Sequence, residues 1–555
     1  MNRLYYGDNL FIMERMAKYS VDLIYLDPPF KSDQNYNLLY KNFTGRPVPE
    51  QAEAFCDTWE MDAEKERLAK AMPVLMREYD VDEYYIDFWR LWMQALRHTQ
   101  PHLLAYLIYM VRRLLQMKII LKPTGSLYLH CDPTASHYIK VMMDGIFHHS
   151  NFRNEIIWKR TSAHSGAKRY GPVHDVLLYY TVSDSFVWNP QYQPYDESYI
   201  RSHFGNVSED GAKYYTGDLT GPGVRDGASG QPWRGFNPTD RGRHWQPASY
   251  LYSKFAELTG EDLAAHPFLE RLDKLDEADL IYWPKKDNGW PRYKQFLLDR
   301  EGVPLQDVWT DISPINSQAK NRMGYPTQKP MALLDRIVRS SSNPGQVVFD
   351  PFCGCGTTVY AAHEAGRSWI GCDVAILAVK LIERQLDQRY GLVKGEHYTE
   401  EGIPNSVASA KALWDQHPGQ FEHWVVEAVD GFPNSKKSAD RGIDGRIYFD
   451  MKDDEIAWMA LSVKGGNIRP TDIRDLRGVL SDEPDVYLAG FITMQEPSKK
   501  MREAAAEAGM WEYQGHAYER VQILTVKEIV EDKKRFNTPT KIGMKHKLEQ
   551  ALLPL

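Results

Sequence analysis

Apolar positions in the first part of the chain form short runs that are typical of buried strands. Residues 21–26 predict a strand that ends at Asp27, residues 125–130 predict a second strand, and residues 176–180 predict a third. A long helical stretch and a Pro-Thr-Gly turn precede the second of these strands. This part of the chain is therefore predicted to alternate strands with helices.

The same alternation returns over residues 325–390. A helix at 331–341 leads to a strand at 346–349, a Gly-rich turn, a second helix and a strand at 368–372. Strands that alternate with helices in both regions predict an α/β fold with a mainly parallel, doubly wound sheet.

Between these two regions the chain is rich in Gly, Pro, Asp, Arg and Trp, and its poor periodicity predicts a loop-rich insertion. A stretch that mixes Gly, Glu, His, Pro, Asn and Ser follows the second region and is interpreted as a linker to a further, smaller α/β domain. The predicted segments are 1–185 and 321–390 for the two halves of the sheet, 186–320 for the insertion, 391–418 for the linker, 419–535 for the smaller domain and 536–555 for a C-terminal tail.

Composition narrows the class of protein. A chain of 555 residues is too long for one ordinary domain, and 43% hydrophobic with 12% aromatic residues supply packed cores. Five cysteines at irregular spacing argue against a disulfide framework. The most apolar stretch, 103–121, is interrupted by Arg112, Arg113 and Lys118, so it predicts a buried helix rather than a membrane span. Because no basic-then-apolar signal segment follows Met1, we expect a soluble, cytoplasmic protein.

The strand at 21–26 ends in the motif Asp27-Pro28-Pro29-Phe30. A carboxylate here, with a nearby backbone carbonyl, can accept both hydrogen bonds of an exocyclic amino group and aim the nitrogen lone pair at an activated methyl group. The prolines remove backbone donors and stiffen the turn, and Phe30 offers an aromatic face on which an extruded base can stack. Taken alone, the motif is equally compatible with an ordinary strand-ending turn.

A second motif runs from Asp350 through Gly354 and Gly356 to Thr357, and combines a strand end, a Gly-rich turn and a helix start. The glycines let the backbone approach a ligand, and the helix start offers free amides. Asp373 ends the next strand, where an acid can hold the two ribose hydroxyls of a nucleoside cofactor. The Cys-x-Cys pair in the turn has no second Cys or His pair beside it, so no metal site is predicted there.

Together these motifs resemble the amino-methylating DNA methyltransferases of the beta arrangement. In that family the catalytic motif comes first, the cofactor motif last, and a target-recognition region lies between them. Residues 324–330 also resemble the family's segment beside the cofactor, and Gly7 with Asp8 resembles its Gly-Asp pair near the cofactor adenine. The resemblance covers roughly residues 1–390 and implies S-adenosylmethionine as the cofactor.

The resemblance also implies a role for each motif residue. Asp27, Pro28, Pro29 and Phe30 form the implied catalytic motif, in which Phe30 replaces the commoner Tyr and keeps the stacking face. The implied cofactor-binding residues are Asp8, Lys329, Asp350, Pro351, Phe352, Gly354, Gly356, Thr357 and Asp373. In this family, Asp rather than Ser at position 27 favours adenine N6 over cytosine N4 as the target, although the preference is not a rule.

The net charge of −8 gives no overall nucleic-acid signature, but a local basic face is sufficient for binding. Around Arg234, and around Arg241 and Arg243, arginines alternate with aromatic residues in flexible turns. Arginines can contact guanine edges or phosphates, and aromatic rings can stack on bases or wedge between them. Lys159 and Arg160, together with Lys168 and Arg169, form another basic cluster, expected near phosphates. The alternative for each cluster is a solvated loop with no partner.

Residues 421–427 predict an amphipathic helix, followed by a hairpin that carries Asp444 and a strand that ends at Lys464. This order resembles the PD-(D/E)xK nuclease fold in its Mrr-like variety, in which two acids bind magnesium and the lysine supports the attacking water. Ser462 stands where that family has an acid or an amide, which argues against cleavage unless Glu427 replaces the missing ligand. We favour the alternative, an accessory domain that binds DNA or a partner without cutting it.

The expected function is site-specific transfer of a methyl group from S-adenosylmethionine to N6 of adenine in double-stranded DNA, within a restriction-modification or epigenetic system. Two alternatives stay open: a cytosine-N4 methyltransferase, and a bifunctional methyltransferase and restriction endonuclease that would also need magnesium. A homodimer or a restriction-system partner is compatible with each, and no membrane partner is expected. A non-catalytic DNA-binding scaffold would leave both motifs without a purpose. A protein or small-molecule methyltransferase has little need of so large an Arg- and Trp-rich insertion.

Overall fold

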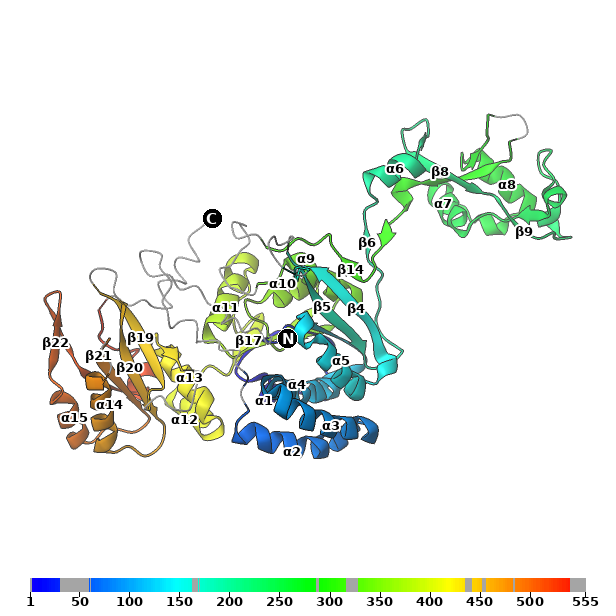
Figure 1. Cartoon of the computed structure of the whole chain (residues 1–555). Coiled ribbons are helices and arrows are strands. Elements are labelled where there is room, and N and C mark those ends of the chain that lie inside the picture. The colour runs from blue at the N-terminus through cyan, green and yellow to red at the C-terminus, as the bar shows by residue number, and fades with distance from the viewer. Residues whose placement is uncertain are drawn as a thin grey trace. The chain divides into compact units, whose positions relative to one another are not determined.

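The structure is a computed structural model of the chain (Figure 1). It describes residues 2–29, 59, 61–161, 168, 170–285, 289–315, 328–434, 442–451, 456–482 and 485–539. The chain divides into two compact units, which are described separately. The first unit comprises Met1–Asn189 and Gln306–Leu555, and the second comprises Pro190–Leu305.

A nine-stranded sheet forms the centre of the first unit. Its strands lie in the order β14 (Val308–Trp309), β4 (Phe152–Lys159), β5 (His174–Thr181), β3 (Leu121–Cys131), β2 (Val21–Leu26), β15 (Val347–Asp350), β16 (Ser368–Asp373), β1 (Asn2–Tyr6) and β17 (Tyr398–Glu401). Neighbouring strands are parallel except around β5, which is antiparallel to both β3 and β4. The predicted α/β class and mainly parallel sheet are confirmed.

Strands β2 and β15 are neighbours although they are far apart in the sequence. The buried carboxylate of Asp22, at the start of β2, holds them in register. It accepts hydrogen bonds from Lys122 Nζ at 2.8 and 2.9 Å, from Gln346 Nε2 at 3.0 Å and from the Val347 amide at 2.9 Å. The chain continues from β2 towards β3 on one side and from β15 towards β16 on the other. Such a topological switch point is where open α/β sheets bind ligands, at the carboxyl ends of the strands.

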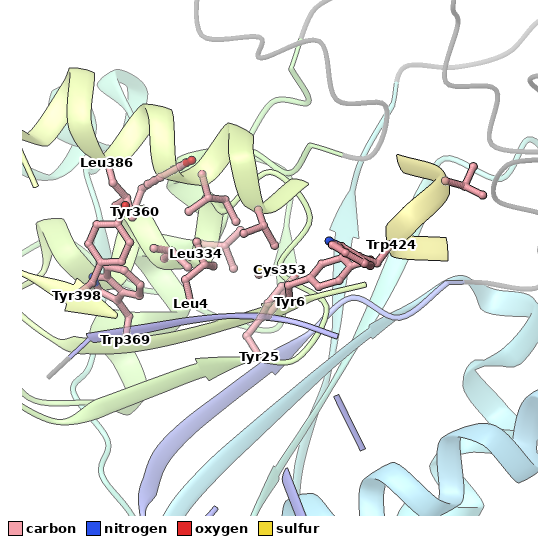
Figure 2. Close-up of a cluster of buried hydrophobic side chains, with 14 of the residues drawn as sticks. Leu4, Tyr6, Tyr25, Leu334, Cys353, Tyr360, Trp369, Leu386, Tyr398 and Trp424 are labelled. Carbon is pink, nitrogen blue, oxygen red and sulfur yellow. The ribbon is translucent and has the colours of Figure 1, made fainter. Parts of the chain in front are cut away.

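Helices cover both faces of this sheet. One face packs against α1 (Asn9–Arg15), α2 (Ala63–Glu78), α3 (Glu83–Thr99), α4 (Pro101–Ile120) and α5 (Pro133–Phe147). The other face packs against α9 (Met331–Ser341), α10 (Thr357–Glu364) and α11 (Ile376–Tyr390), and part of this core is shown in Figure 2. The residues of β2 alternate between the two cores, because successive strand side chains point to opposite faces.

The apolar stretch at 103–121 forms most of α4, as predicted, and it is buried against the sheet. Within the part of the chain that the structure describes, no helix has the length and apolar character needed to cross a membrane.

The segment predicted to be a linker, 391–418, contains regular structure instead. Strand β17 adds to the edge of the large sheet, parallel to β1, and α12 (Val407–Gln416) follows it. Buried Tyr398 anchors the strand, with its ring centroid 5.7 Å from that of Trp369. The linker prediction was wrong because the Gly and Pro residues of this segment mark only the turns between its elements.

A five-stranded sheet forms the C-terminal part of the first unit, in the order β18 (Phe432–Pro433), β19 (Gly445–Asp450), β20 (Ile456–Lys464), β21 (Val486–Thr493) and β24 (Val521–Thr525). Strands β18, β19 and β20 pair antiparallel, whereas β20, β21 and β24 pair parallel. One face packs on α14 (Pro470–Asp482) and α15 (Lys499–Ala506), and the other on α13 (Pro418–Ala428) and α16 (Val526–Val530). The helix predicted at 421–427 is α13.

The second unit has its own hydrophobic core, around Trp233 and Trp245. Its largest sheet has the order β11 (Ile281–Tyr282), β12 (Arg292–Phe296), β8 (Lys213–Asp218) and β7 (Asn206–Val207). Helices α6 (Glu197–His203), α7 (Ser249–Thr259) and α8 (Phe268–Glu277) also belong to it. This region is more ordered than the predicted loop-rich insertion at 186–320, because strands of only two to six residues and short 3-10 turns leave little periodicity in the sequence.

Candidate functional site

Asp27 lies directly after β2, at the switch point between β2 and β15. Its carboxylate forms an ion pair with the ammonium group of Lys329, and each side chain is only 14% exposed. Lys329 comes from the segment just before α9, and the resemblance implied a cofactor contact for it. The structure places it on the predicted catalytic acid. Phe30 and residues 324–327 lie outside the described residues.

The ion pair leaves Asp27 able to bind a further group. Lys329 contacts the Oδ2 atom, and a carboxylate has two oxygens with about four acceptor positions in all. Oδ1 can therefore accept from an amino group while Lys329 holds the carboxylate in place. Pro28 is buried beside it, so the turn that carries Asp27 is fixed by packing as well as by its two prolines.

A buried polar network lies behind the end of β2. The Tyr25 hydroxyl is 2.9 Å from His130 Nδ1, and His130 Nε2 is 3.2 Å from Asp175 Oδ2. Asp175 in turn forms an ion pair with Arg160 at 3.3 Å. Burial and the nearby charge of Lys329 lower the pKa of His130, so the network favours a neutral imidazole between a hydroxyl and a carboxylate.

Tyr25, His130 and Asp175 were not predicted as part of the site, and Arg160 was predicted only as part of a basic cluster near phosphates. His130 and Asp175 lie on β3 and β5, within apolar runs that were interpreted only as buried strands. A polar residue in such a run is a usable signal, because buried polar groups need a partner. The sequence does not show which partner the fold brings to it.

Hydrogen bonds to the Asp350 side chain stabilise the Gly-rich turn after β15. Asp350 is 3% exposed, and its Oδ1 accepts from the Phe352 amide at 2.9 Å while its Oδ2 accepts from Thr358 Oγ1 at 2.5 Å. Desolvation raises the pKa of Asp350 to about 7. Gly356 has a φ of 88°, and a Cβ there would lie 2.7 Å from a side-chain carbon of Ile382. Asp350 thus shapes the turn, and Gly356 is required for it.

Asp373, at the end of β16, connects this turn to the next helix. Its Oδ2 accepts from the Gly354 amide at 2.8 Å, and its Oδ1 accepts from the Ala375 amide at 2.9 Å. Burial raises the pKa of this carboxyl to about 6. Each oxygen has a further acceptor position, so the carboxylate can still receive ribose hydroxyls while it holds the turn.

Asp8 joins the same edge of the sheet from the end of β1. Its Oδ1 caps α1 by accepting from the Leu10 amide at 2.9 Å, and it forms an ion pair with Arg113 at 2.7 Å. Buried Arg113 also donates to Asn9 Oδ1, and Asn9 Nδ2 donates to the Pro351 carbonyl, both at 2.7 Å. These bonds connect the N-terminal Gly-Asp pair to the Gly-rich turn.

Arg113 and Asn9 were not predicted as site residues. Arg113 was noted only as an interruption of an apolar stretch, yet its guanidinium lies 3.4 Å from the ring centroid of Tyr109 within that helix. A charged residue in a buried helix requires a compensating charge. That requirement points to a nearby carboxylate, but only the fold identifies it as Asp8.

Three carboxyl ends of parallel strands thus meet around one turn, and the groups present suit a nucleoside cofactor. The start of α10 has no side-chain cap, so its first amides can donate to a ligand. Asp8 and Asp373 offer acceptors on either side of the turn. The predicted catalytic residue, Asp27, follows the neighbouring strand.

The arginines predicted to bind DNA lie in the second unit, where two of them have partners within that unit. Arg234 forms ion pairs with Asp273, at 3.2 Å, and Asp276. Arg243 donates to Thr220 Oγ1 at 2.7 Å. Arg241 is exposed and lies 4.3 Å from the ring centroid of Trp290.

Lys168 is also exposed, whereas Arg169 lies outside the described residues. The role of these basic residues in DNA binding stays a prediction. Arg234, Arg241 and Lys168 are exposed to solvent, and Arg234 is also held by its two ion pairs.

In the C-terminal sheet, Asp444, Ser462 and Lys464 lie on one face. Gly445 pairs with Leu461, so Asp444 lies beside Ser462, and Lys464 is two residues further along β20. Asp444 Oδ2 accepts from the Val463 amide at 2.7 Å and from Ser462 Oγ at 3.5 Å.

Glu427 does not supply the missing ligand at this place. It lies on α13, which packs on the opposite face of the sheet, and its carboxylate contacts Tyr6 and the amide of Ile376. The proposed substitution of Glu427 for the missing acid was therefore wrong, because the sheet separates the two.

Metal-binding side chains do not cluster in the described residues: His, Cys, Asp and Glu form no group of three or more that could hold an ion there. Cys131, Cys353, Cys355 and Cys372 are buried free thiols. Burial raises the pKa of the Cys355 thiol to about 12, so it stays protonated near neutral pH.

Comparison with known proteins identifies the family. A profile of the DNA methylase family matches residues 21–384, which is more than half of the chain and includes both motifs. The chain therefore belongs to the DNA methylase family.

Individual relatives match shorter stretches. The type II methyltransferase M.EcaI of Enterobacter cloacae is 32% identical over 282 residues, which cover 51% of this chain and 57% of that protein. The DNA adenine methyltransferase YhdJ of Escherichia coli (strain K12) is 44% identical over 97 residues, covering 18% of this chain and 31% of that protein. Both matches span less than two thirds of the relative's own length. Among solved structures, PvuII DNA methyltransferase (cytosine-N4-specific) is similar with 10% identity and a TM-score of 0.32, covering 69% of this chain and 86% of that one.

Proposed function

We propose that this protein is an S-adenosylmethionine-dependent DNA methyltransferase that modifies N6 of adenine at specific sites in double-stranded DNA, as part of a restriction-modification system. One observation carries the proposal. The pairing of β2 with β15 places Asp27 beside the turn that runs from Asp350 to Thr357, although the two motifs lie at opposite ends of the matched region. This juxtaposition brings an amino-group acceptor next to a nucleoside-binding edge.

The chain's own residues position the reacting amino group. Asp27 would accept an amino hydrogen bond through Oδ1, while Lys329 holds Oδ2 and fixes the orientation of the carboxylate. A backbone carbonyl near Asp27 would accept the second amino hydrogen bond. When both hydrogens are drawn out of the plane of the base, the nitrogen lone pair is free for attack. After transfer the nitrogen must lose a proton, and Asp27 is the carboxylate placed to accept it. Phe30 is predicted to provide the stacking face.

The methyl donor would be held at the edge formed by β15, β16 and β1, and it would supply an electrophilic methyl group on a sulfonium. Asp373 would accept hydrogen bonds from the ribose hydroxyls, and Asp8 would lie near the adenine. The amides at the start of α10 are donors for the amino-acid end of the donor. Water exclusion by the buried turn strengthens each of these contacts.

Adenine is the proposed base for two reasons. Asp at position 27 is the choice that the family resemblance associates with adenine, and the relative YhdJ is described as a DNA adenine methyltransferase. Cytosine N4 has the same exocyclic amino chemistry, so the geometry of Asp27 suits it equally. The base therefore has to be determined directly.

The test is transfer of tritiated methyl groups from S-adenosylmethionine to unmethylated double-stranded DNA, followed by digestion to nucleosides and mass spectrometry. We expect N6-methyladenine. The matched control is DNA from cells that already express the protein, which should accept no further label. Recovery of N4-methylcytosine would correct the base, and a complete lack of transfer to any DNA would overturn the proposed function.

For the C-terminal sheet we propose DNA engagement with little or no hydrolysis. Asp444 is the one carboxylate of the Asp444, Ser462 and Lys464 group, and it is already bonded to the Val463 amide. A hydroxyl such as that of Ser462 is a poor replacement for a carboxylate on a hard cation. Lys464 can still attract the phosphate backbone, so binding can persist without cleavage.

A further inference from the structure

Helices α12 and α13 lie against the end of β1 and the start of α1. The His417 ring lies against that of Phe11, with centroids 3.8 Å apart and the planes tilted by 32°, and Gln416 Oε1 accepts from Arg15 at 2.8 Å. Gln420 lies over the backbone of Gly7, where a Cβ would be 2.6 Å from its Nε2. The C-terminal part of the chain therefore contacts the segment that presents Asp8.

Glu427, further along α13, makes a second set of contacts. Its Oε2 accepts from the Tyr6 hydroxyl and from the Ile376 amide, each at 3.4 Å. Trp424, from the same helix, belongs to the same buried cluster as Tyr6 (Figure 2). Desolvation, with a contribution from the charge of Asp373, raises the pKa of the Glu427 carboxyl to about 8.

These contact points flank the two acids of the predicted donor site. Tyr6 and Gly7 directly precede Asp8, and Ile376 is three residues after Asp373. The Gly7 amide also donates to the Asp373 carbonyl at 2.9 Å, which joins the two segments. One helix of the C-terminal part thus touches both segments.

A cavity of about 800 Å³ lies beside this junction. Gly7 and Asp8 line it from the N-terminal segment. His417, between α12 and α13, and Gln420, on α13, line it from the C-terminal part. The contacts of His417 and Gln420 are therefore made at the rim of this cavity.

We propose that α13 forms part of the wall of the methyl-donor site, and that Glu427 is a positioning residue that couples occupancy of this site to the C-terminal sheet. The inference rests on the proposed function. Coupling of this kind is reciprocal: if donor binding orders α13, then whatever the C-terminal sheet binds must change the donor affinity by the same factor. The sheet and the donor site share α13, because its buried face also packs on β20.

Two replacements of Glu427 test whether its side-chain oxygen acts as the hydrogen-bond acceptor for Tyr6 and Ile376. Glu427→Ala leaves the Tyr6 hydroxyl and the Ile376 amide without an acceptor, which should weaken donor binding about tenfold. Glu427→Gln keeps an amide oxygen that can accept from both donors, so it should bind within about threefold of the unchanged protein. The control is Asp415→Ala, which removes a carboxylate from an exposed ion pair on neighbouring α12 and should have no effect.

The experiment measures hydrogen exchange of the full-length protein with and without S-adenosylhomocysteine, together with calorimetric affinities for the three variants. We expect slower exchange across 418–428 on binding, lost in Glu427→Ala and kept in Glu427→Gln. A purely structural role would lower the melting temperature of Glu427→Ala but leave its affinity unchanged. Normal affinity in Glu427→Ala with no protection of α13 would overturn the inference. Failure of the unchanged protein to bind the ligand at all would instead overturn the proposed function.

Discussion

The two sheets of the first unit each carry an acid at a strand end, but the surroundings of the two acids differ. Asp27 follows β2 and is paired with Lys329, which comes from a distant part of the chain. Asp444 precedes β19, and its carboxylate accepts hydrogen bonds from the Val463 amide and the Ser462 hydroxyl on the adjacent strand. A cation from a distant segment pairs with the first acid, whereas an amide and a hydroxyl of the adjacent strand donate to the second.

The difference shows why a motif alone does not define a site. Around Asp27, the ends of four neighbouring strands bring together groups from the N-terminus, the Gly-rich turn and the segment before α9. Around Asp444, the adjacent strand donates an amide and a hydroxyl to the carboxylate, and among the described residues His, Cys, Asp and Glu form no group of three or more that could hold a metal ion. A catalytic site requires functional groups from several elements to lie within reach of one another.

The largest expected effect is on Asp27. Asp27→Ala removes the acceptor of the amino group, so methyl transfer should fall by more than about a hundredfold. Affinity for S-adenosylmethionine should stay within about threefold. Tritium transfer to DNA, measured beside calorimetric binding, gives both quantities. If label transfer persists in the variant, Asp27 does not act on the amino group.

A second variant tests whether Lys329 orients Asp27 or contacts the cofactor. Lys329→Met removes the cation but keeps a long side chain, so the Asp27 carboxylate loses its fixed orientation. We expect kcat to fall about a hundredfold, because small displacements of a reacting group are costly. The dissociation constant for S-adenosylmethionine should hardly change. A large loss of cofactor affinity at normal kcat would show that Lys329 contacts the cofactor instead.

Asp373 is expected to have a moderate effect that depends on pH. Asp373→Ala should weaken S-adenosylmethionine binding by about 1.5 to 3 kcal/mol, the range for a hydrogen bond to a charged group. Because the pKa of Asp373 is raised to about 6, the unchanged protein should lose affinity as the pH falls below about 6, where the carboxylate is protonated. Calorimetric titrations from pH 5 to 8 test this. The variant should show no such dependence, and equal affinity in both proteins would place the ribose elsewhere.

The smallest effect is expected at the C-terminal sheet. Full-length protein incubated with unmethylated DNA and magnesium or manganese, without a methyl donor, should produce no specific cuts. Lys464→Ala should weaken DNA binding by about threefold, since one phosphate contact is lost. Specific cuts that disappear in both Asp444→Ala and Lys464→Ala would show a working nuclease and make the protein bifunctional.

The parts of the site that lie within one short segment could be predicted from the sequence. Asp27 follows its strand, and Asp373 ends the strand after the Gly-rich turn, because both positions follow from the local order of strand, turn and helix. The α/β class was predictable for the same reason. The family resemblance implied that the two motifs serve one site, but the pairing of β2 with β15 that joins them was not predicted.

Partners from distant segments could not be predicted. His130 and Asp175 meet because β3 pairs with β5, and Arg113 reaches Asp8 from α4. In the sequence, each of these residues is only a polar position in an apolar run. Glu427 is a case in which the sequence suggested a partner that the fold does not bring to it. It was assigned to the nearest acidic motif in the sequence, whereas in the fold its carboxylate accepts from the Tyr6 hydroxyl and the Ile376 amide.

The most direct test of the central claim is sequencing, with base-modification detection, of DNA from cells that express either the unchanged protein or Asp27→Ala. The account predicts methylated adenines at one recurring sequence in the first DNA and none at that sequence in the second. Absence of any modified amino group in the first DNA, or the same pattern in both, would contradict it.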